Sequence, residues 1–152
     1  MAGLSLLPST GEGKIMAESV SLDVPSHATW VATPVWVQAG DRLVFRAEGT
    51  WFDAVIPCSA DGYPAPFFYA LNLLPRIPDD GRYFRLMGRI VADGQQPSTD
   101  DATATFAIGT ACQRNVAAAG RLFAFANDRA GFYWNNFGSV HLSIQIIRKD
   151  PA

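Results

Sequence analysis

The C-terminal part of the sequence alternates apolar and polar residues at every second position. In residues 139–147, SVHLSIQII, the even positions from 140 to 146 are aliphatic, and His, Ser and Gln lie between them. Successive side chains of a β-strand point to opposite faces, so this period is typical of a half-buried strand. Residues 41–48 alternate in the same way, with Leu43, Phe45 and Ala47 on one face. Both stretches therefore predict strands that bury one face in a core.

Strand patterns recur at short spacing along the chain, and helical spacing is scarce. Roughly eight short strands with turn residues between them predict an all-β protein, an antiparallel β-sandwich. The length of 152 residues suits one domain. Residues 1–27, interrupted by Gly, Ser and Pro, are expected to be an N-terminal extension, and residues 28–152 to be the single β-sandwich domain.

A proline-dense stretch at residues 56–81 interrupts the strand pattern. It contains five prolines, a density that neither a helix nor a central strand tolerates. Long irregular segments in compact domains are usually functional loops or lids. We therefore expect a functional loop here.

The charge balance argues against nucleic acid as a partner. The chain has 12 basic and 14 acidic residues and no basic cluster. It therefore lacks the positive patch that would attract the phosphates of a nucleic acid. No apolar run reaches the roughly 18–20 residues of a transmembrane segment. The N-terminus lacks the basic region of a secretory signal. The expected location is the cytoplasm, with release or cell-surface association by a route without a signal peptide as the alternative.

The sequence contains no recognisable catalytic motif. GxSxG, HExxH and phosphate-binding glycine-rich patterns are absent, and the two histidines, His27 and His141, have no evident catalytic partners. We therefore predict that the protein is not an enzyme. Cys58 and Cys112 lack metal-type spacing with histidine and are expected to be free thiols.

Residues 127–136, NDRAGFYWNN, connect two predicted strands and carry many oxygen ligands. Ca²⁺ binds about six to eight oxygens from carboxylates, amides and carbonyls. Asp128 offers a carboxylate, Asn135 and Asn136 offer amides, and Phe132 can turn its carbonyl inward. The alternative is a turn in which Asn and Asp bond their own backbone. Trp134, within the same loop, suits either stacking on a sugar or packing.

Three blocks of the sequence resemble the PA-IL-type galactose-binding lectins of bacteria. They are AGDRLVFRAEGTW at 39–51, LMGRI at 86–90 and AAGRLFAFANDRAGFYWNNFGSVHLSIQI at 118–146. The third block is the most specific, because it carries an Asn-Asp, a Gly, an Asn-Asn and a following Gly in order. The resemblance implies a galactose-binding-domain-like sandwich of jelly-roll type and a bound Ca²⁺.

The resemblance also implies roles for particular residues. Asp128, Asn135 and Asn136 would bind Ca²⁺ through side chains and Phe132 through its carbonyl. The fifth protein ligand would be Asp53, at a position where the family uses a backbone carbonyl. Two vicinal sugar hydroxyls would complete the coordination, assisted by Asp128, Asn135 and the backbone of Arg129. Trp134 is a further candidate for sugar contact. The family's His-x-x-Gln for sugar contact is missing from the proline-rich loop.

Together these features predict a calcium-dependent lectin that binds galactose or a related glycoside. Shallow sugar sites gain strength when several subunits present them together, so we expect a homo-oligomer. The alternative is a non-catalytic protein-interaction or accessory module on the same sandwich, without sugar binding.

Overall fold

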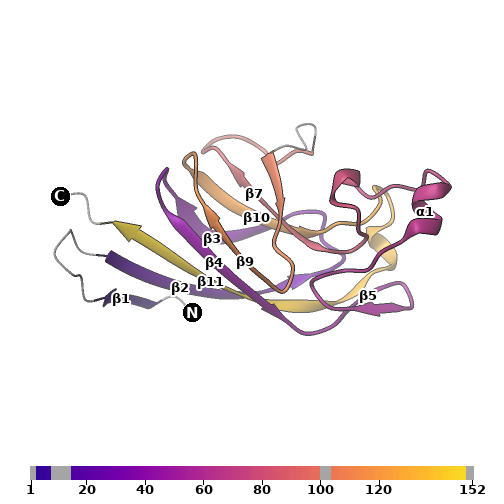
Figure 1. Cartoon of the computed structure of the whole chain (residues 1–152), viewed down its shortest axis with the longest axis horizontal. Helices are drawn as coiled ribbons and strands as arrows, with labels where there is room; N and C mark the ends of the chain where they lie inside the picture. Colours follow the sequence, from indigo (N-terminus) through magenta and orange to yellow (C-terminus); the bar gives the residue numbers. More distant parts are fainter. Residues whose placement is uncertain (1–2, 8–14, 100–103, 150–152) are drawn as a thin grey trace.

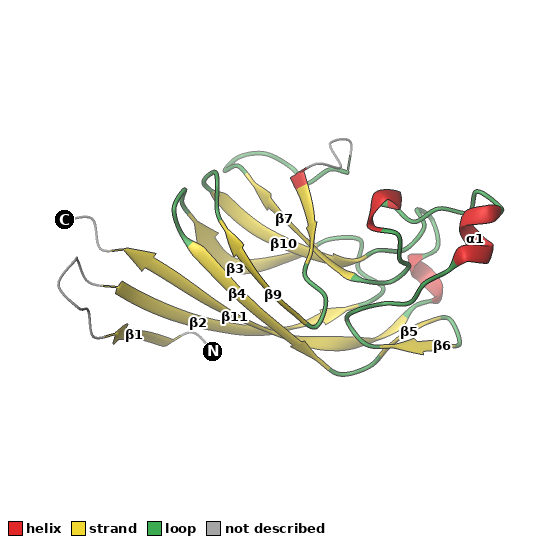
Figure 2. Cartoon of the chain, in the orientation of Figure 1, coloured by secondary structure: helices red, strands yellow, loops and turns green. Residues whose placement is uncertain are grey.

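The computed structural model describes residues 3–7, 15–99 and 104–149, which form two antiparallel β-sheets packed face to face (Figures 1 and 2). The predicted all-β sandwich is therefore confirmed. The larger sheet has the order β1 (Gly3–Leu7), β2 (Ile15–Pro25), β11 (Phe137–Lys149), β4 (Arg42–Glu48) and β9 (Ala111–Asn115), with β5 (Trp51–Asp53) joining β11 to β6 (Ile56–Cys58). The smaller sheet has the order β3 (Val31–Val37), β10 (Gly120–Ala126), β7 (Leu86–Val91) and β8 (Thr105–Ala107).

The alternating stretches form the central strands of the larger sheet. Every aliphatic position from Val140 to Ile146 on β11 is at most 1% exposed. The register pairs Ile144 with Phe45 of β4, so the apolar positions of the two strands share one face. Phe45 in turn contacts Phe106 of the smaller sheet, with ring centroids 6.0 Å apart. The apolar face predicted from period alone is thus the face that meets the second sheet.

The N-terminal residues contribute a long strand to the same sandwich. β2 pairs with β11 along its whole length, from Pro25 opposite Ser139 to Ile15 opposite Lys149. Val20 and Val24 lie in the core. The segment 1–27 that we expected as an extension therefore contains a strand of the β-sandwich. The rest of that segment lies partly outside the described residues.

The proline-dense stretch folds into short elements at one end of the sandwich. It begins with β6 and continues through α1 (Pro66–Ala70) and the 3-10 helix η1 (Pro78–Asp80). Each helix has a proline in its first turn, where the missing N–H is not needed for a helical hydrogen bond. These helices, together with the 3-10 helix η3 (Tyr133–Asn135), gather at the right of Figure 2, beyond the ends of the strands.

None of the helices in the described residues is long and apolar enough to cross a membrane. Cys58 and Cys112 are both free, as expected.

Candidate functional site

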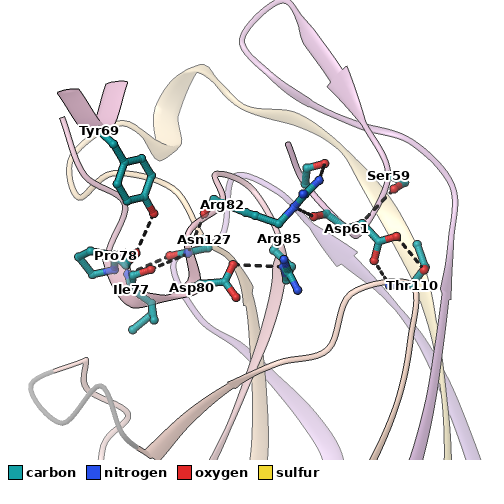
Figure 3. A network of polar contacts seen from close by, with 11 residues as sticks. Ser59, Asp61, Tyr69, Ile77, Pro78, Asp80, Arg82, Arg85, Thr110 and Asn127 are labelled. Atoms are coloured by element: carbon teal, nitrogen blue, oxygen red, sulfur yellow. Dashed lines mark hydrogen bonds and ion pairs between the residues drawn. The ribbon is translucent and has the colours of Figure 1, made fainter. Parts of the chain in front are cut away.

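The loop between β10 and β11 is anchored to the proline-dense stretch by Asn127. The side chain of Asn127 is fully buried. Its Oδ1 accepts from the Ile77 amide at 2.9 Å, and its Nδ2 donates to the Ile77 carbonyl at 3.0 Å and the Arg82 carbonyl at 3.2 Å (Figure 3). One amide thus satisfies three backbone groups of the neighbouring loop. This side chain holds the two loops together.

Replacing Asn127 with alanine is expected to lower the free energy of unfolding by about 2 kcal/mol. The change leaves buried backbone groups of Ile77 and Arg82 without partners, and each such group is costly. For a chain of this size, the melting temperature should fall by about 4–8 °C. The control is Asn115→Ala on edge strand β9, where the side chain is exposed. Equal melting temperatures for the two variants would contradict the anchoring role.

Tyr133 of η3 fixes the path of the loop on its other side. Its buried hydroxyl donates to the carbonyl of Ala126 at 2.5 Å and accepts from Arg76 Nη1 at 2.8 Å. It also accepts from the backbone amide of Asp128 at 3.3 Å. Burial raises the pKa of Tyr133 to about 12, so the hydroxyl stays protonated as a donor. These bonds set the backbone at Asp128.

Four of the candidate metal ligands line one pocket of about 240 Å³ at this end of the sandwich. They are Asp53, Asp128, Phe132 and Asn135. Asp53 comes from β5, whereas the others come from the loop after β10. The remaining wall of the pocket is mainly apolar and is formed by Ala54, Val55, Ile56, Phe68, Leu73, Tyr83 and Arg129.

The Asp128 carboxylate is held rigidly and is only 2% exposed. Its Oδ1 accepts from the Arg129 backbone amide at 2.7 Å, and its Oδ2 accepts from Asn136 Nδ2 at 2.8 Å. The pKa of Asp128 is raised to about 6, mainly by burial and also by the nearby Asp53 carboxylate, while the hydrogen bonds from Asn136 and Arg129 act to lower it. A cation between the two acids would offset both the burial of the Asp128 charge and its repulsion from Asp53.

Asp53 is oriented by a residue that the sequence did not identify, Tyr63. The Tyr63 hydroxyl donates to Asp53 Oδ2 at 2.5 Å, and burial raises the pKa of Asp53. Tyr63 is positioned by paired backbone hydrogen bonds with Tyr83, both 2.9 Å. The preceding Gly62 permits this approach, because a Cβ there would lie 2.2 Å from the Tyr83 carbonyl oxygen.

The amide oxygens of Asn135 and Asn136 are buried and have no hydrogen-bond partner among the described residues. Asn136 uses its Nδ2 for Asp128 and for the Ser26 carbonyl, at 3.2 Å, so its Oδ1 is left over. Buried polar atoms without partners are rare and costly, so these two oxygens are available to bind a cation. In the part of the chain that the structure describes, no three His, Cys, Asp or Glu side chains cluster. A cation here would therefore need amide and carbonyl oxygens beside the two acids, a donor set that suits Ca²⁺.

The two remaining candidates for sugar contact lie differently. Arg129 lines the pocket, with its guanidinium 5.1 Å from the ring centroid of Phe132. Trp134 is 79% exposed and does not line the pocket. Among the described residues, seven large apolar side chains are exposed, and six of them lie in the segments at this end of the sandwich. We refer to these six side chains as the apolar collar: Val55, Phe67, Leu71, Phe132, Trp134 and Phe137.

The sequence did not identify four further residues of the site, which are Tyr63, Phe68, Leu73 and Tyr83. All four belong to the proline-dense stretch or the segment that follows it. Their aromatic and aliphatic side chains could be read from the sequence, but the position of these side chains near Asp128 could not. The proline density was the one available signal, because it marked residues 56–81 as a functional loop.

Comparisons with known proteins bear on the fold. No protein-family model and no curated protein matches the sequence. Among solved structures, the N-terminal domain of EclA, described as a PllA-like lectin, superposes with a TM-score of 0.60 at 18% identity, over 83% of this chain and 94% of that one. The chain has the fold of this lectin domain. PliG of Aeromonas hydrophila, a periplasmic inhibitor of g-type lysozyme, matches with a TM-score of 0.45 at 10% identity, over 93% of this chain and 92% of that one.

Proposed function

We propose that the protein is a calcium-dependent lectin that binds a carbohydrate through the pocket between β5 and the loop after β10. The observation that carries this proposal is the pair of buried amide oxygens, on Asn135 and Asn136, that lack partners beside the Asp128 carboxylate. The likeness in fold to a PllA-like lectin domain supports the same direction.

In this proposal five residues hold the ion. Asp53 and Asp128 supply carboxylates, Asn135 and Asn136 supply amide oxygens, and Phe132 supplies its carbonyl. The ion would provide positive charge and open coordination positions for two vicinal sugar hydroxyls. Asp128, Asn135 and the backbone of Arg129 would bond these hydroxyls as well. Trp134 would contact a sugar unit beyond the first, because its ring is exposed next to Asn135.

Galactose or a related glycoside is the proposed sugar, on the strength of the resemblance to the PA-IL-type lectins. The apolar wall of the pocket, with Phe68 and Leu73, adds space for an apolar group attached to the sugar. A homo-oligomer presenting several such sites would strengthen binding to a surface that carries many glycans.

Titration calorimetry tests the proposal in two steps. Protein stripped with EDTA and dialysed is titrated first with CaCl₂ and then, in excess calcium, with methyl galactoside. We expect heat of binding in the first step with about one ion per chain, and heat in the second step only when calcium is present. The proposal fails if the stripped protein binds no calcium. Calcium binding without galactoside binding would redirect the search to other sugars.

The apolar collar favours a second candidate function, a protein-interaction module. Exposed apolar patches commonly mark protein interfaces, and these six side chains lie in segments at one end of the sandwich. In that case calcium and sugar would give no heat, and a double variant, Phe67→Ser with Leu71→Ser, would abolish the capture of a protein partner. The lectin proposal expects the same double variant to keep its calcium heat.

A further inference from the structure

Trp36 is the only exposed large apolar side chain in the described residues that lies outside the apolar collar. It is 47% exposed, although its neighbours Val35 and Val37 on β3 are buried in the core. Trp36 therefore faces outward from the smaller sheet. Trp36 pairs with Arg121 at the start of β10, whereas Asp128 follows the end of that strand. With about 3.3 Å of rise per residue, the two positions are on the order of 20 Å apart.

The Trp36 ring contacts Arg121, and the Trp36 backbone is hydrogen-bonded to Arg148. The guanidinium of Arg121 lies 5.6 Å from the ring centroid of Trp36 and 5.9 Å from that of Phe123. Arg121 is itself fixed, because its Nε donates to the Thr33 carbonyl at 2.7 Å. Arg148 Nη2 donates to the backbone carbonyl of Trp36 at 2.6 Å. A ring fixed in advance loses little conformational entropy when a ligand stacks on it.

Two hollows flank this ring. One, of about 460 Å³, is lined by Trp36, Phe123, Arg121 and the connection after β7, which includes Asp93, Gln95 and Gln96. The other, of about 410 Å³, is lined by Trp36 together with Gln38, Asp93 and Arg148. Both volumes fall in the range of small-ligand sites. Trp36 and Asp93 belong to both hollows, so one ligand could run across the ring from one hollow to the other.

The polar side chains around the ring are free to bind a ligand. Within the described residues, Asp93, Gln95 and Gln96 make no side-chain hydrogen bond to the protein. Arg121 uses only its Nε, which leaves the donors at the outer end of its guanidinium. The site therefore offers an aromatic face, three amides, the Asp93 carboxylate and the Arg121 guanidinium. Arg148 also lines it, but its charge is balanced by ion pairs with Glu18 and Asp41. The site has no excess of positive charge, which disfavours nucleic acid.

We propose that this surface is a second carbohydrate-binding site, independent of metal, for a glycan chain of at least two sugar units. A pyranose ring has an apolar C–H face and a rim of hydroxyls. The partly positive C–H groups suit the negative face of the Trp36 indole. The hydroxyls suit the surrounding side chains, because Asp93 accepts hydrogen bonds, Arg121 donates them, and the amides of Gln95 and Gln96 do both.

This second site has a consequence for avidity. Since the loop pocket and the Trp36 site lie at opposite ends of β10, one chain would engage two glycans at once. Linked binding events strengthen each other without new contacts, so a monomer could cross-link a glycan surface. The Trp36 site does not depend on the calcium site, because none of the residues around Trp36 lines the loop pocket.

A glycan array probed in the presence of EDTA tests the inference, with neutral oligosaccharides of two to six units as the probes. We expect wild-type protein to bind a subset of these oligosaccharides in EDTA, where a metal-dependent site cannot act. We expect Trp36→Ala to lose at least about 10-fold in affinity for them, a loss that corresponds to about 1.4 kcal/mol, because the stacking on the indole ring is removed. Phe67→Ala, which removes another exposed aromatic ring at the other end of the sandwich, is the matched control and should bind as wild type does.

Two results would overturn the inference. One is the absence of any EDTA-resistant binding on the array, which would leave a peptide or another class of ligand for this surface. The other is equal binding by Trp36→Ala and wild type. A melting temperature of Trp36→Ala close to that of wild type shows that the exposed ring was removed without unfolding the sheet. Calcium heat in Trp36→Ala reports on the proposed function separately, so the two proposals fail independently.

Discussion

Asp128→Asn is expected to weaken calcium binding by at least about 100-fold and to abolish calcium-dependent sugar binding. The change keeps the shape of the side chain, and its oxygen can still accept from Asn136 Nδ2. It removes the negative charge, and the charge of the ligands sets much of the affinity for Ca²⁺. The fold should persist, because no apolar core contact is lost. Calorimetry with CaCl₂ and then methyl galactoside measures both effects.

Asp23→Asn is the matched control for this variant. Asp23 is also an acid with one close side-chain partner, His141 at 2.9 Å, but its side chain is 71% exposed and does not line the pocket. It should bind calcium as wild type does. If Asp128→Asn retained calcium binding, the ligand loop would have been assigned wrongly. If both variants lost it equally, the effect would come from net charge rather than from the pocket.

The metal-free protein is expected to lose stability as the pH rises from about 4 to about 6. The pKa of Asp128 is raised from 3.8 in the ordinary side chain to about 6 in the folded chain, so the folded state binds more protons in this range. The stabilising contribution is complete below the lower value and disappears as the pH passes the higher one. A shift of this size corresponds to about 3 kcal/mol. Urea unfolding in EDTA at pH 4, 5, 6 and 7 measures the loss.

Calcium should reverse this pH dependence. The ion binds the ionised carboxylates, so the stabilisation it adds grows as the pH rises from 5 to 7. Asp128→Asn serves as the control, because it should show a flatter profile in EDTA and no gain from calcium. The raised pKa values of Asp53 and Asp80 act in the same direction and should leave a smaller slope in that variant. An EDTA profile that rises from pH 4 to 6 would contradict the burial argument for Asp128.

The fold class and the local ligand cluster were predictable because both depend on neighbouring residues. The alternation of β4 and β11 needs only the two-residue period of a strand, and it correctly assigned the buried face. Asp128, Asn135 and Asn136 are close in sequence, so one loop brings their oxygens together. Asp53 became a candidate only through the resemblance to known lectins.

Other features depended on contacts between distant segments. Residues 15–25, which form β2, were expected to belong to an N-terminal extension. Their place in the sheet comes from pairing with β11, more than a hundred residues away. Phe68 lines the pocket and Tyr63 reaches Asp53 because the proline-dense loop folds back against Asn127. Trp134 shared the polar loop with the proposed ligands, yet the turn of η3 leaves its ring outside the pocket.

The sequence by itself determined that strands would form, which of their faces would be buried, and that one loop would concentrate oxygen ligands. Each of these follows from residue type and short-range spacing. The tertiary structure alone decided that Asp53 would lie beside Asp128, that two amide oxygens would be buried without partners, and that Trp36 would be held over an open hollow. Those results depend on sheet register and loop packing, which join residues far apart in the chain.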